Sequence, residues 1–261
     1  MPIAYLLDLE GTLYTDQGVI PGAPEAIAAL RGRGTRFRCV SNTTTRTRAA
    51  LAARLAGYGY DIPASDILTP VSAAVAHCRT HGLNRVVAYV REAALEDLTG
   101  LEVLPRGEAG YHGQVVTPDA ILVGDLGDAW TFAVMQEAFT HVVAGAEILA
   151  LSRDRYFSRE SRLTLDAGAF VAGLEYATGR TAMVLGKPSA TFFQMARATF
   201  HDSDEVIMVG DDLWSDIQGA QRAGLRAWLV RTGKFQEHVL RDSGVTPDRI
   251  IDSVVEVGSE K

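Results

Sequence analysis

Cysteine is scarce in this chain of 261 residues, which contains only Cys39 and Cys78. The two fall in different expected elements without CxxC spacing, so we expect two buried thiols in a reducing cytosol rather than a disulfide or a thiolate metal site. No stretch reaches the roughly 18 uncharged apolar residues of a membrane span. The N-terminal run MPIAYLLDLEG has no basic segment before it and so does not predict a signal peptide. These absences favour a cytoplasmic protein without a membrane partner.

Positive charge is also in short supply, since the net charge is −7 and the isoelectric point is about 5.4. A protein that binds duplex nucleic acid normally carries a basic face, so this balance argues against a nucleic-acid partner. The sequence has no low-complexity segment and no repeat of fixed period. The remaining composition is ordinary for a globular protein, with 47% hydrophobic and 22% charged residues. The length suits one large domain or two smaller ones.

The first part of the chain alternates expected strands and helices. Ala4–Leu9 and Arg36–Val40 are short runs typical of buried strands in a parallel sheet, whose two faces are both covered. Helices are expected over Pro24–Arg33 and Thr43–Gly57, the latter with one of its first two threonines as the N-terminal cap. This order predicts a doubly wound α/β domain with right-handed crossovers.

The last third has the same style, with expected strands at Thr181–Leu185, Val206–Val209, Ala227–Val230 and Arg249–Ile251 and expected helices at Ser189–Thr199 and Trp214–Ala223. The middle of the chain is too long for a loop, because structureless connections beyond about 15 residues are uncommon in compact domains. Its expected strands are Val86–Val90, Ala120–Val123 and Ile148–Ala150, and its helices lie near Ser72–His81, Trp130–Val142 and Asp166–Thr178. We therefore predict a core formed by residues 1–70 and 180–261, with residues 71–179 inserted as a second α/β domain.

Polar residues close the expected strands of the core. Asp8 and Glu10 close the first strand, and Ser41 and Asn42 close the second. Lys187 follows the strand Thr181–Leu185, and Asp211 and Asp212 follow the strand Val206–Val209. Ligands of open α/β sheets bind beyond the carboxyl ends of the strands, so these groups are expected at one edge. Taken singly, each group could be a turn, a helix cap or a solvated loop residue. Taken together, those readings would need four separate coincidences.

The acidic residues at this edge require a counter-charge. Asp216 lies one helical turn beyond the Asp211–Asp212 pair, so up to five acids converge with one lysine. Two carboxylates about 4 Å apart repel by roughly 4 kcal/mol at an effective dielectric constant near 20. A hard divalent cation with oxygen ligands relieves this repulsion, and Mg²⁺ suits sites that share a substrate phosphate. The pattern therefore predicts a magnesium site for phosphoryl transfer, with a small phosphorylated molecule as substrate.

Four segments together resemble the motifs of the haloacid dehalogenase (HAD) superfamily, in the same order and spacing. They are DLEGTLY at Asp8–Tyr14, SNTTT at Ser41–Thr45, GKPS at Gly186–Ser189 and VGDDLWSD at Val209–Asp216. The insertion between the second and third resembles the C2 type of cap found in the NagD-like branch. RYFSRESRLTLDAGAF (Arg155–Phe170) and VRTGKF (Val230–Phe235) look like segments of phospholysine phosphohistidine inorganic pyrophosphate phosphatases and their relatives. The resemblance implies a Rossmann-like HAD core with an inserted C2 cap.

The resemblance also implies roles for individual residues. Asp8 is expected to be the nucleophile and a Mg²⁺ ligand, together with Asp211 and the backbone carbonyl of Glu10. Asp216 is expected to act on the metal through water or to hold Lys187, with Asp212 in support of this set. The transferring phosphate is expected to be held by Lys187, Ser41 and Asn42. Candidate substrate contacts are Arg46, Arg155, Tyr156 and Asp166. Dimerisation through the cap is common among relatives, so a cap-mediated homodimer is among the expected states.

One position departs from the family pattern. The acid/base residue two positions after the nucleophile is Glu10 rather than the usual Asp. The extra methylene displaces the carboxyl group, and a misplacement near 1 Å can cost about 10²-fold in rate. We therefore expect a slower or substrate-restricted hydrolysis of the phosphoenzyme. Two alternatives stay open at this point: phosphoryl transfer to an acceptor other than water, and a non-catalytic phosphate-ligand binding protein on a HAD scaffold.

Overall fold

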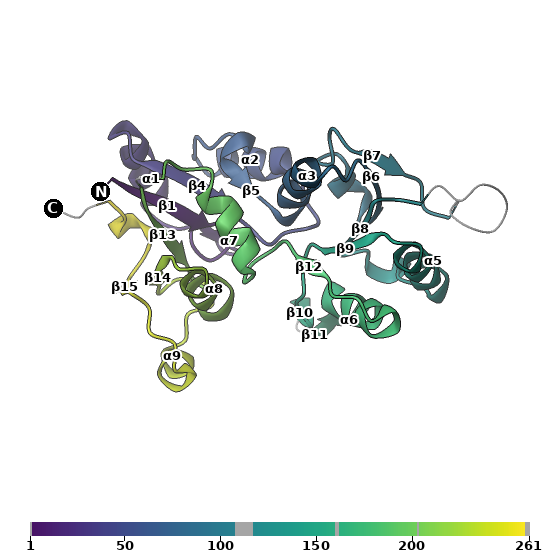
Figure 1. Ribbon diagram of the computed structural model, residues 1–261. Coiled ribbons are helices and arrows are strands. Elements are labelled where there is room, and N and C mark those ends of the chain that lie inside the picture. Colours follow the sequence, from purple (N-terminus) through teal and green to yellow (C-terminus); the bar gives the residue numbers. More distant parts are fainter. Residues whose placement is uncertain (1, 108–116, 160–161, 203, 259–261) are drawn as a thin grey trace. The chain divides into compact units, whose positions relative to one another are not determined.

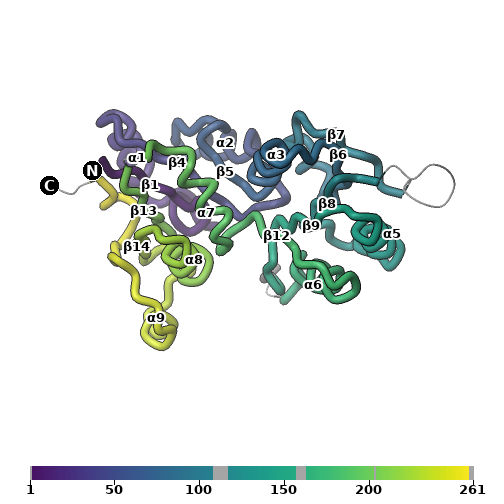
Figure 2. Tube along the Cα trace, in the orientation of Figure 1, coloured from purple at the N-terminus to yellow at the C-terminus, as the bar shows by residue number. Residues whose placement is uncertain are grey.

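The computed structural model describes residues 2–107, 117–159, 162–202 and 204–258, with the backbone alone at residues 157–159 and 162. The chain forms two compact units (Figures 1 and 2). The first, called the core unit, contains Met1–Ser41, Arg48–Leu68 and Lys187–Lys261. The second, called the inserted unit, contains Asn42–Thr47 and Thr69–Gly186.

The core unit is built on a parallel sheet of six strands in the order β15-β14-β13-β1-β4-β5. Their bounds are β1 Ile3–Asp8, β4 Arg36–Val40, β5 Ile67–Leu68, β13 Glu205–Gly210, β14 Arg226–Val230 and β15 Arg249–Ile251. The central strand β1 is apolar on both faces, with Ala4, Leu6 and Leu7 fully buried. That burial is what a strand needs when helices cover both faces of its sheet.

Helices and short turns surround this sheet. They are α1 Ala23–Gly32, α2 Arg48–Gly57, α7 Ala190–Arg197, α8 Gly219–Arg222 and α9 Glu237–Ser243, with the 3₁₀ turns η1 Ala64–Asp66 and η4 Val254–Glu256, the π-helical turn η3 Leu213–Gln218, and the small hairpin β2 Tyr14–Thr15 and β3 Gly18–Val19. Tyr5 and Leu7 of β1 pack in one cluster with Leu30 of α1 and Leu55 of α2. On the ribbon, α7 and α8 lie side by side (Figure 1).

The inserted unit has its own parallel sheet of five strands in the order β12-β9-β8-β6-β7. Its elements are α3 Pro70–His81, β6 Arg85–Tyr89, α4 Glu92–Leu95, β7 Glu102–Leu104, β8 Ala120–Val123, η2 Gly127–Ala129, α5 Phe132–Val143, β9 Glu147–Ala150, the hairpin β10 Tyr156–Arg159 and β11 Arg162–Leu165, α6 Ala167–Thr178 and β12 Met183–Val184. Val123 of β8, Val142 of α5 and Val171 of α6 share the apolar core of this unit. None of the helices in the described part of the chain is long and apolar enough to cross a membrane.

The structure confirms the predicted α/β class, with a parallel core sheet and an inserted α/β unit. The structure adds elements that were not expected, among them strands β5, β7, β10 and β11 and helices α4 and α9. Three of the expected elements differ in their start, type or sheet. Helix α2 begins at Arg48 rather than Thr43, and the backbone N–H of Thr45 approaches Thr43 Oγ1 at 3.5 Å instead. Threonine hydroxyls that contact local backbone groups compete with helix formation, which explains the late start.

The other two differences concern the expected segments Thr181–Leu185 and Trp214–Ala223. The first forms β12, which pairs with β9 of the inserted sheet and not with the core sheet. A short apolar run shows that a strand is present but does not show which sheet it joins. The second begins as the π-helical turn η3 before it continues as α8. The π-helical turn is a local widening that periodicity does not reveal, and such turns are frequent at functional sites.

Candidate active site

The strand register brings the ends of β1, β4 and β13 together at one edge of the core sheet. Asp8 is the last residue of β1 and pairs with Val40 of β4, and the preceding residue pairs with Val209 of β13. Ser41 comes one residue after Val40, and Asp211 comes directly after β13. The predicted convergence of Asp8, Ser41 and Asp211 at this edge follows from that register.

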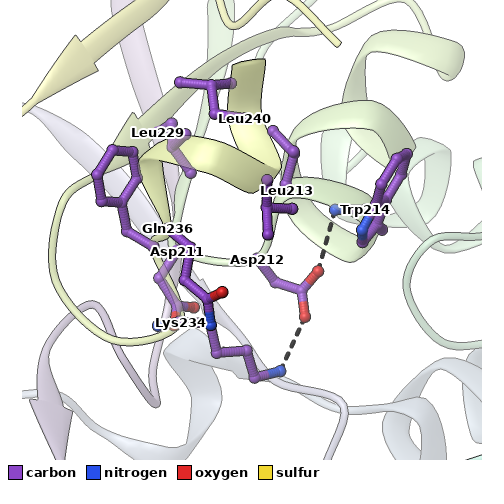
Figure 3. A pocket seen from close by; sticks show the side chains of 10 residues that line it. Asp211, Asp212, Leu213, Trp214, Leu229, Lys234, Gln236 and Leu240 are labelled. Carbon is purple, nitrogen blue, oxygen red and sulfur yellow. Dashed lines mark hydrogen bonds and ion pairs between the residues drawn. The ribbon is translucent and has the colours of Figure 1, made fainter. Parts of the chain in front are cut away.

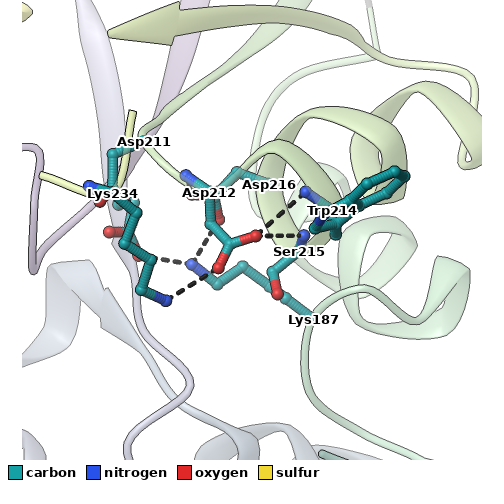
Figure 4. Close-up of polar contacts among 8 residues, drawn as sticks. Lys187, Asp211, Asp212, Trp214, Ser215, Asp216 and Lys234 are labelled. Atoms are coloured by element: carbon teal, nitrogen blue, oxygen red, sulfur yellow. Dashed lines mark hydrogen bonds and ion pairs between the residues drawn. The ribbon is translucent and has the colours of Figure 1, made fainter. Parts of the chain in front are cut away.

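Lys187 links two of the acidic residues. Its Nζ donates hydrogen bonds to Oδ1 of Asp8 and, over 2.6 Å, to Oδ1 of Asp216, and Figure 4 shows the lysine reaching into this group. All three side chains are buried. Burial alone would lower the pKa of Lys187, but the charges of Asp216 and Asp8 outweigh it and raise that pKa. The neighbouring carboxylates therefore favour the charged form of Lys187. It lies in the loop between β12 and α7, not at the end of a core strand as the sequence suggested.

Asp8, Asp211 and Asp216 form a buried group of carboxylates with an oxygen of each within 4.8 Å of the others. Burial raises the pKa of Asp8 to about 6, against the opposing charge of Lys187. Burial also raises the pKa of Asp211 to about 6, with a contribution from Asp216. The pKa of Asp216 rises to about 7 through burial, which outweighs the charge of Lys187. Burial therefore favours the protonated form of these three carboxyl groups as long as no cation balances their charge.

The donor set fits a hard divalent cation. Three carboxylates and one ammonium group leave two uncompensated negative charges when all are ionised, and one divalent ion balances them. Carboxylate oxygens are ligands that Mg²⁺ accepts while it keeps several waters. The group contains neither a histidine nor a cysteine that would favour a softer metal. Asp8, Asp211 and Asp216 are therefore the residues that could hold Mg²⁺, and Lys187 could hold a phosphate beside it.

Asp212 organises the turn that carries Asp216. Its Oδ1 accepts hydrogen bonds from the backbone N–H groups of Trp214 at 3.0 Å and Ser215 at 2.9 Å. The backbone N–H of Asp212 donates to Asp216 Oδ2 at 3.1 Å. Burial would raise the pKa of Asp212, but Lys234 and the two N–H groups outweigh it and lower that pKa. These contacts favour the charged form of Asp212, which is the N-terminal cap of η3 and sets the position of Asp216.

A second group of contacts comes from the loop after β14, which the sequence analysis did not assign to the site. Thr232 Oγ1 donates to the backbone oxygen of Gly11. The backbone N–H of Lys234 donates to Asp211 Oδ2 at 2.7 Å, and its Nζ lies 2.8 Å from Asp212 Oδ2. The strand-end rule could have found these residues, because they follow the carboxyl end of the expected strand Ala227–Val230.

A pocket of about 150 Å³ lies beside this loop (Figure 3). Its lining is mostly apolar, with Lys234, Asp211 and Asp212 on one side: Asp211, Asp212, Leu213, Trp214, Leu229, Lys234, Phe235, Gln236, Val239 and Leu240. The pocket belongs wholly to the core unit and borders the acidic group.

Glu10 does not join the buried carboxylates. Glu10 is exposed, and its backbone forms an isolated β-bridge with Tyr14. The guanidinium group of Arg54 lies 4.4 Å from the centre of the Tyr14 ring and experiences the negative charge of Glu10. The expected coordination of a metal by the Glu10 carbonyl remains a prediction.

The remaining candidates belong to the inserted unit. Asn42 is half-buried, and Arg46, Arg155 and Tyr156 are exposed. Asp166 caps helix α6, since its Oδ1 accepts the backbone N–H of Ala167 at 2.6 Å. Phosphate or substrate contacts by these residues remain predictions.

Sequence comparisons identify the family. Residues 5–103 match the Haloacid dehalogenase-like hydrolase family, and residues 184–257 match the HAD-hydrolase-like family. The Haloacid dehalogenase-like hydrolase domain-containing protein 2 of Bos taurus is 36% identical over 234 residues, which cover 89% of this chain and 85% of that protein. The chain belongs to the haloacid dehalogenase-like hydrolases.

Other members of the family place it in the NagD-like branch. The human phospholysine phosphohistidine inorganic pyrophosphate phosphatase is 31% identical over 261 residues, covering 96% of this chain and 91% of that protein. The structure of NagD from E. coli K-12 matches with a TM-score of 0.83 and 27% identity, over 98% of this chain and 99% of that one. A glycerol phosphate phosphatase from Mycobacterium tuberculosis, solved in complex with magnesium, matches with a TM-score of 0.78 and 27% identity, over 96% of this chain and 75% of that one.

Proposed function

We propose that this HAD protein is a Mg²⁺-dependent phosphatase that uses Asp8 as its nucleophile. The observation that carries the proposal is the buried group at the sheet edge, in which Lys187 bridges Asp8 and Asp216 beside Asp211. The group has the charge balance for one divalent cation. The relative that was solved with magnesium was also solved with calcium, which supports a divalent cation at such a site.

Asp8 would attack the phosphorus atom of the substrate, so that a bond forms between a carboxylate oxygen and phosphorus while the bond to the leaving group breaks. Glu10 would donate a proton to the departing oxygen or nitrogen. Water would then attack the phosphorus of the aspartyl-phosphate, and Glu10 would take the proton that this water loses. Inorganic phosphate leaves, and Asp8 returns to its free carboxylate.

The neighbouring residues would stabilise charge during these steps. Mg²⁺, held by Asp8, Asp211, the Glu10 carbonyl and Asp216, would supply positive charge beside the phosphate. Lys187 would hold a second phosphate oxygen, with Ser41 and Asn42 as further hydrogen-bond donors. Because Asp212 fixes the turn before Asp216, it would keep Asp216 directed at Lys187.

The substrate class we propose is a small phosphorylated molecule whose phosphate is joined through an ester, phosphoamide or anhydride bond. The names of the relatives, which include a phosphohistidine and pyrophosphate phosphatase and a glycerol phosphate phosphatase, support this range. The inserted unit would act as the cap that selects the substrate, with Arg46, Arg155, Tyr156 and Asp166 as candidate contacts. A homodimer through that unit is part of the same proposal.

Phosphate release from p-nitrophenyl phosphate, inorganic pyrophosphate and phosphohistidine, measured with and without Mg²⁺, tests the proposal. The wild type should release phosphate from at least one of them only when Mg²⁺ is present. Asp8→Asn keeps the shape of the side chain but removes the nucleophilic charge, so it should show no release above background. Activity that persists in Asp8→Asn would contradict the assignment of the nucleophile.

A second candidate is phosphoryl transfer to an acceptor other than water. It is favoured by Glu10, whose exposed side chain lies outside the buried group, because a poorly placed base slows attack by water. Incubation with a phosphorylated substrate plus glycerol or glucose distinguishes the two. Phosphorylated acceptor in excess of free phosphate supports transfer, and free phosphate as the main product supports hydrolysis.

A further inference from the structure

The segment Thr232–Lys234 contacts Asp211 and two residues next to the acidic group, although the proposed reaction assigns it no step. Thr232 is tied to Gly11, which follows the nucleophile by three positions. The N–H of Lys234 is bonded to Asp211 Oδ2. Its side chain is paired with Asp212. One short loop therefore fixes three parts of the site at once.

Two glycines enclose the same oxygen of Asp211. A Cβ placed on Gly11 would lie 2.0 Å from Asp211 Oδ2, and one placed on Gly233 would lie 2.1 Å from it. Both positions have positive φ, +94° at Gly11 and +62° at Gly233, which glycine adopts at little cost. Asp211 Oδ2 thus sits between two backbones and accepts the N–H of Lys234, so rotation of this carboxylate is strongly restricted.

The two oxygens of Asp211 are consequently unequal. Oδ2 is enclosed and already accepts a hydrogen bond over 2.7 Å, and the partial positive charge of that N–H opposes a cation at the same atom. A cation held by Asp211 would therefore take Oδ1 alone. Mg²⁺ requires compact octahedral coordination at about 2.0–2.1 Å and binds carboxylates through single oxygens. Ca²⁺ takes six to eight oxygens and often binds a carboxylate through both.

We propose that Thr232, Gly233 and Lys234 form a positioning segment that restricts Asp211 to coordination through one oxygen and thereby favours Mg²⁺ over Ca²⁺. The inference rests on the proposed metal site but concerns residues outside it. The chain has three lysines, at positions 187, 234 and 261. Lys187 pairs with Asp8 and Asp216, and Lys234 pairs with Asp212. The charge of Lys234 also offsets that of Asp212, so Asp212 adds no further negative charge at the metal.

Metal titration calorimetry tests the inference without any activity measurement. The dissociation constants of Mg²⁺ and Ca²⁺ are measured for the wild type, for Thr232→Val, which removes the hydroxyl bond to Gly11, and for Lys234→Met, which removes the ion pair with Asp212. Lys234→Met also adds net negative charge, which strengthens the binding of both ions alike. The ratio of the Ca²⁺ to the Mg²⁺ constant cancels that effect and reports positioning alone.

Matched controls are Thr199→Val, which removes a hydroxyl bond to the Ala196 carbonyl, and Arg226→Met, which removes an exposed ion pair with Glu205. We expect the ratio to fall several-fold in Thr232→Val and Lys234→Met and to stay at the wild-type value in both controls. An unchanged ratio in both test variants overturns the positioning role. Failure of the wild type to bind Mg²⁺ would instead count against the proposed function, so the two failures are distinguishable.

Discussion

Lys187 Nζ lies 2.6 Å from Asp216 Oδ1, and the two side chains are only 4% and 1% exposed. A buried ion pair of this kind stabilises little by itself, because removing both charges from water is costly. Removing one partner alone is much more costly, because the charge of the other is then buried without compensation. The pair therefore ties the stability of the core unit to the residues that the proposed reaction needs.

Lys187→Met should destabilise the metal-free protein by about 3 kcal/mol or more, because it leaves buried carboxylates without their counter-charge. The double variant Lys187→Met with Asp216→Asn should be less destabilised than the sum of the two single variants, since it removes both charges. Chemical denaturation in EDTA measures the free energy of unfolding of the wild type, the two single variants and the double variant. Strict additivity of the two changes would show that the pair is not coupled.

Gly11→Ala should disrupt the metal site more than the backbone penalty explains. The new Cβ would overlap Asp211 Oδ2, and a displacement near 1 Å can cost about 10²-fold in function. Gly34→Ala is the matched control, because Gly34 also has positive φ but has nothing within 4 Å of the added Cβ. Calorimetry should show weakened Mg²⁺ binding only in Gly11→Ala, while both variants lose about 1–3 kcal/mol of stability through strained φ. Equal Mg²⁺ affinity in the two variants would contradict this account.

Glu10→Asp should speed the release of phosphate. The shorter side chain restores the acid of the usual family motif, and the expected gain reflects a base closer to the attacking water. Single-turnover experiments should show a shorter-lived phosphoenzyme and a higher rate on at least one substrate. Rates equal to or below wild type on every substrate would mean that Glu10 is already well placed.

The strand ends of the core could be predicted because two rules act together. Buried parallel strands are visible as short apolar runs, and parallel register places their carboxyl ends at one edge. Asp8, Ser41 and Asp211 follow from those rules. The position of Lys187 does not, because the strand before it, β12, pairs in the inserted sheet. Nothing in a run of apolar residues reveals which of two sheets it joins.

The strand-end rule points to the Thr232–Lys234 segment but does not predict its contact with Asp211. The bond to Asp211 is made by a backbone N–H, a group that every residue except proline carries. Residue identity therefore contains no signal for it. The enclosure of Asp211 Oδ2 by Gly11 and Gly233 depends on the close approach of three chain segments, which only the folded structure shows.

Asp166 should contribute to the stability of the inserted unit whether or not it contacts substrate. Its side chain accepts the backbone N–H of Ala167 at the start of α6, so Asp166→Ala should cost about 1 kcal/mol, whereas Asp166→Ser keeps a capping oxygen and should cost less. Thermal unfolding measures the difference. A substrate role would raise KM in both variants, since both lack the carboxylate. Equal destabilisation by Ala and Ser would show that the cap is unimportant.

His141 should make the inserted unit sensitive to mild acid. The ring is fully buried, and its Nε2 lies 3.7 Å from Glu137 Oε1. Burial lowers the pKa of His141, although Glu137 opposes the shift. The folded state therefore binds a proton less readily than the unfolded chain, whose histidine pKa is about 6.5. Stability from this group is present above that pH and is lost as the pH falls below it, by at most about 1.4 kcal/mol per pH unit.

His141→Phe removes the titrating group, so the unfolding temperature of this variant should fall less than that of the wild type between pH 7.5 and 5.5. His238→Phe, at an exposed position of α9, should follow the wild type. Parallel pH profiles for all three proteins would show that the buried ring is not the source of the acid sensitivity.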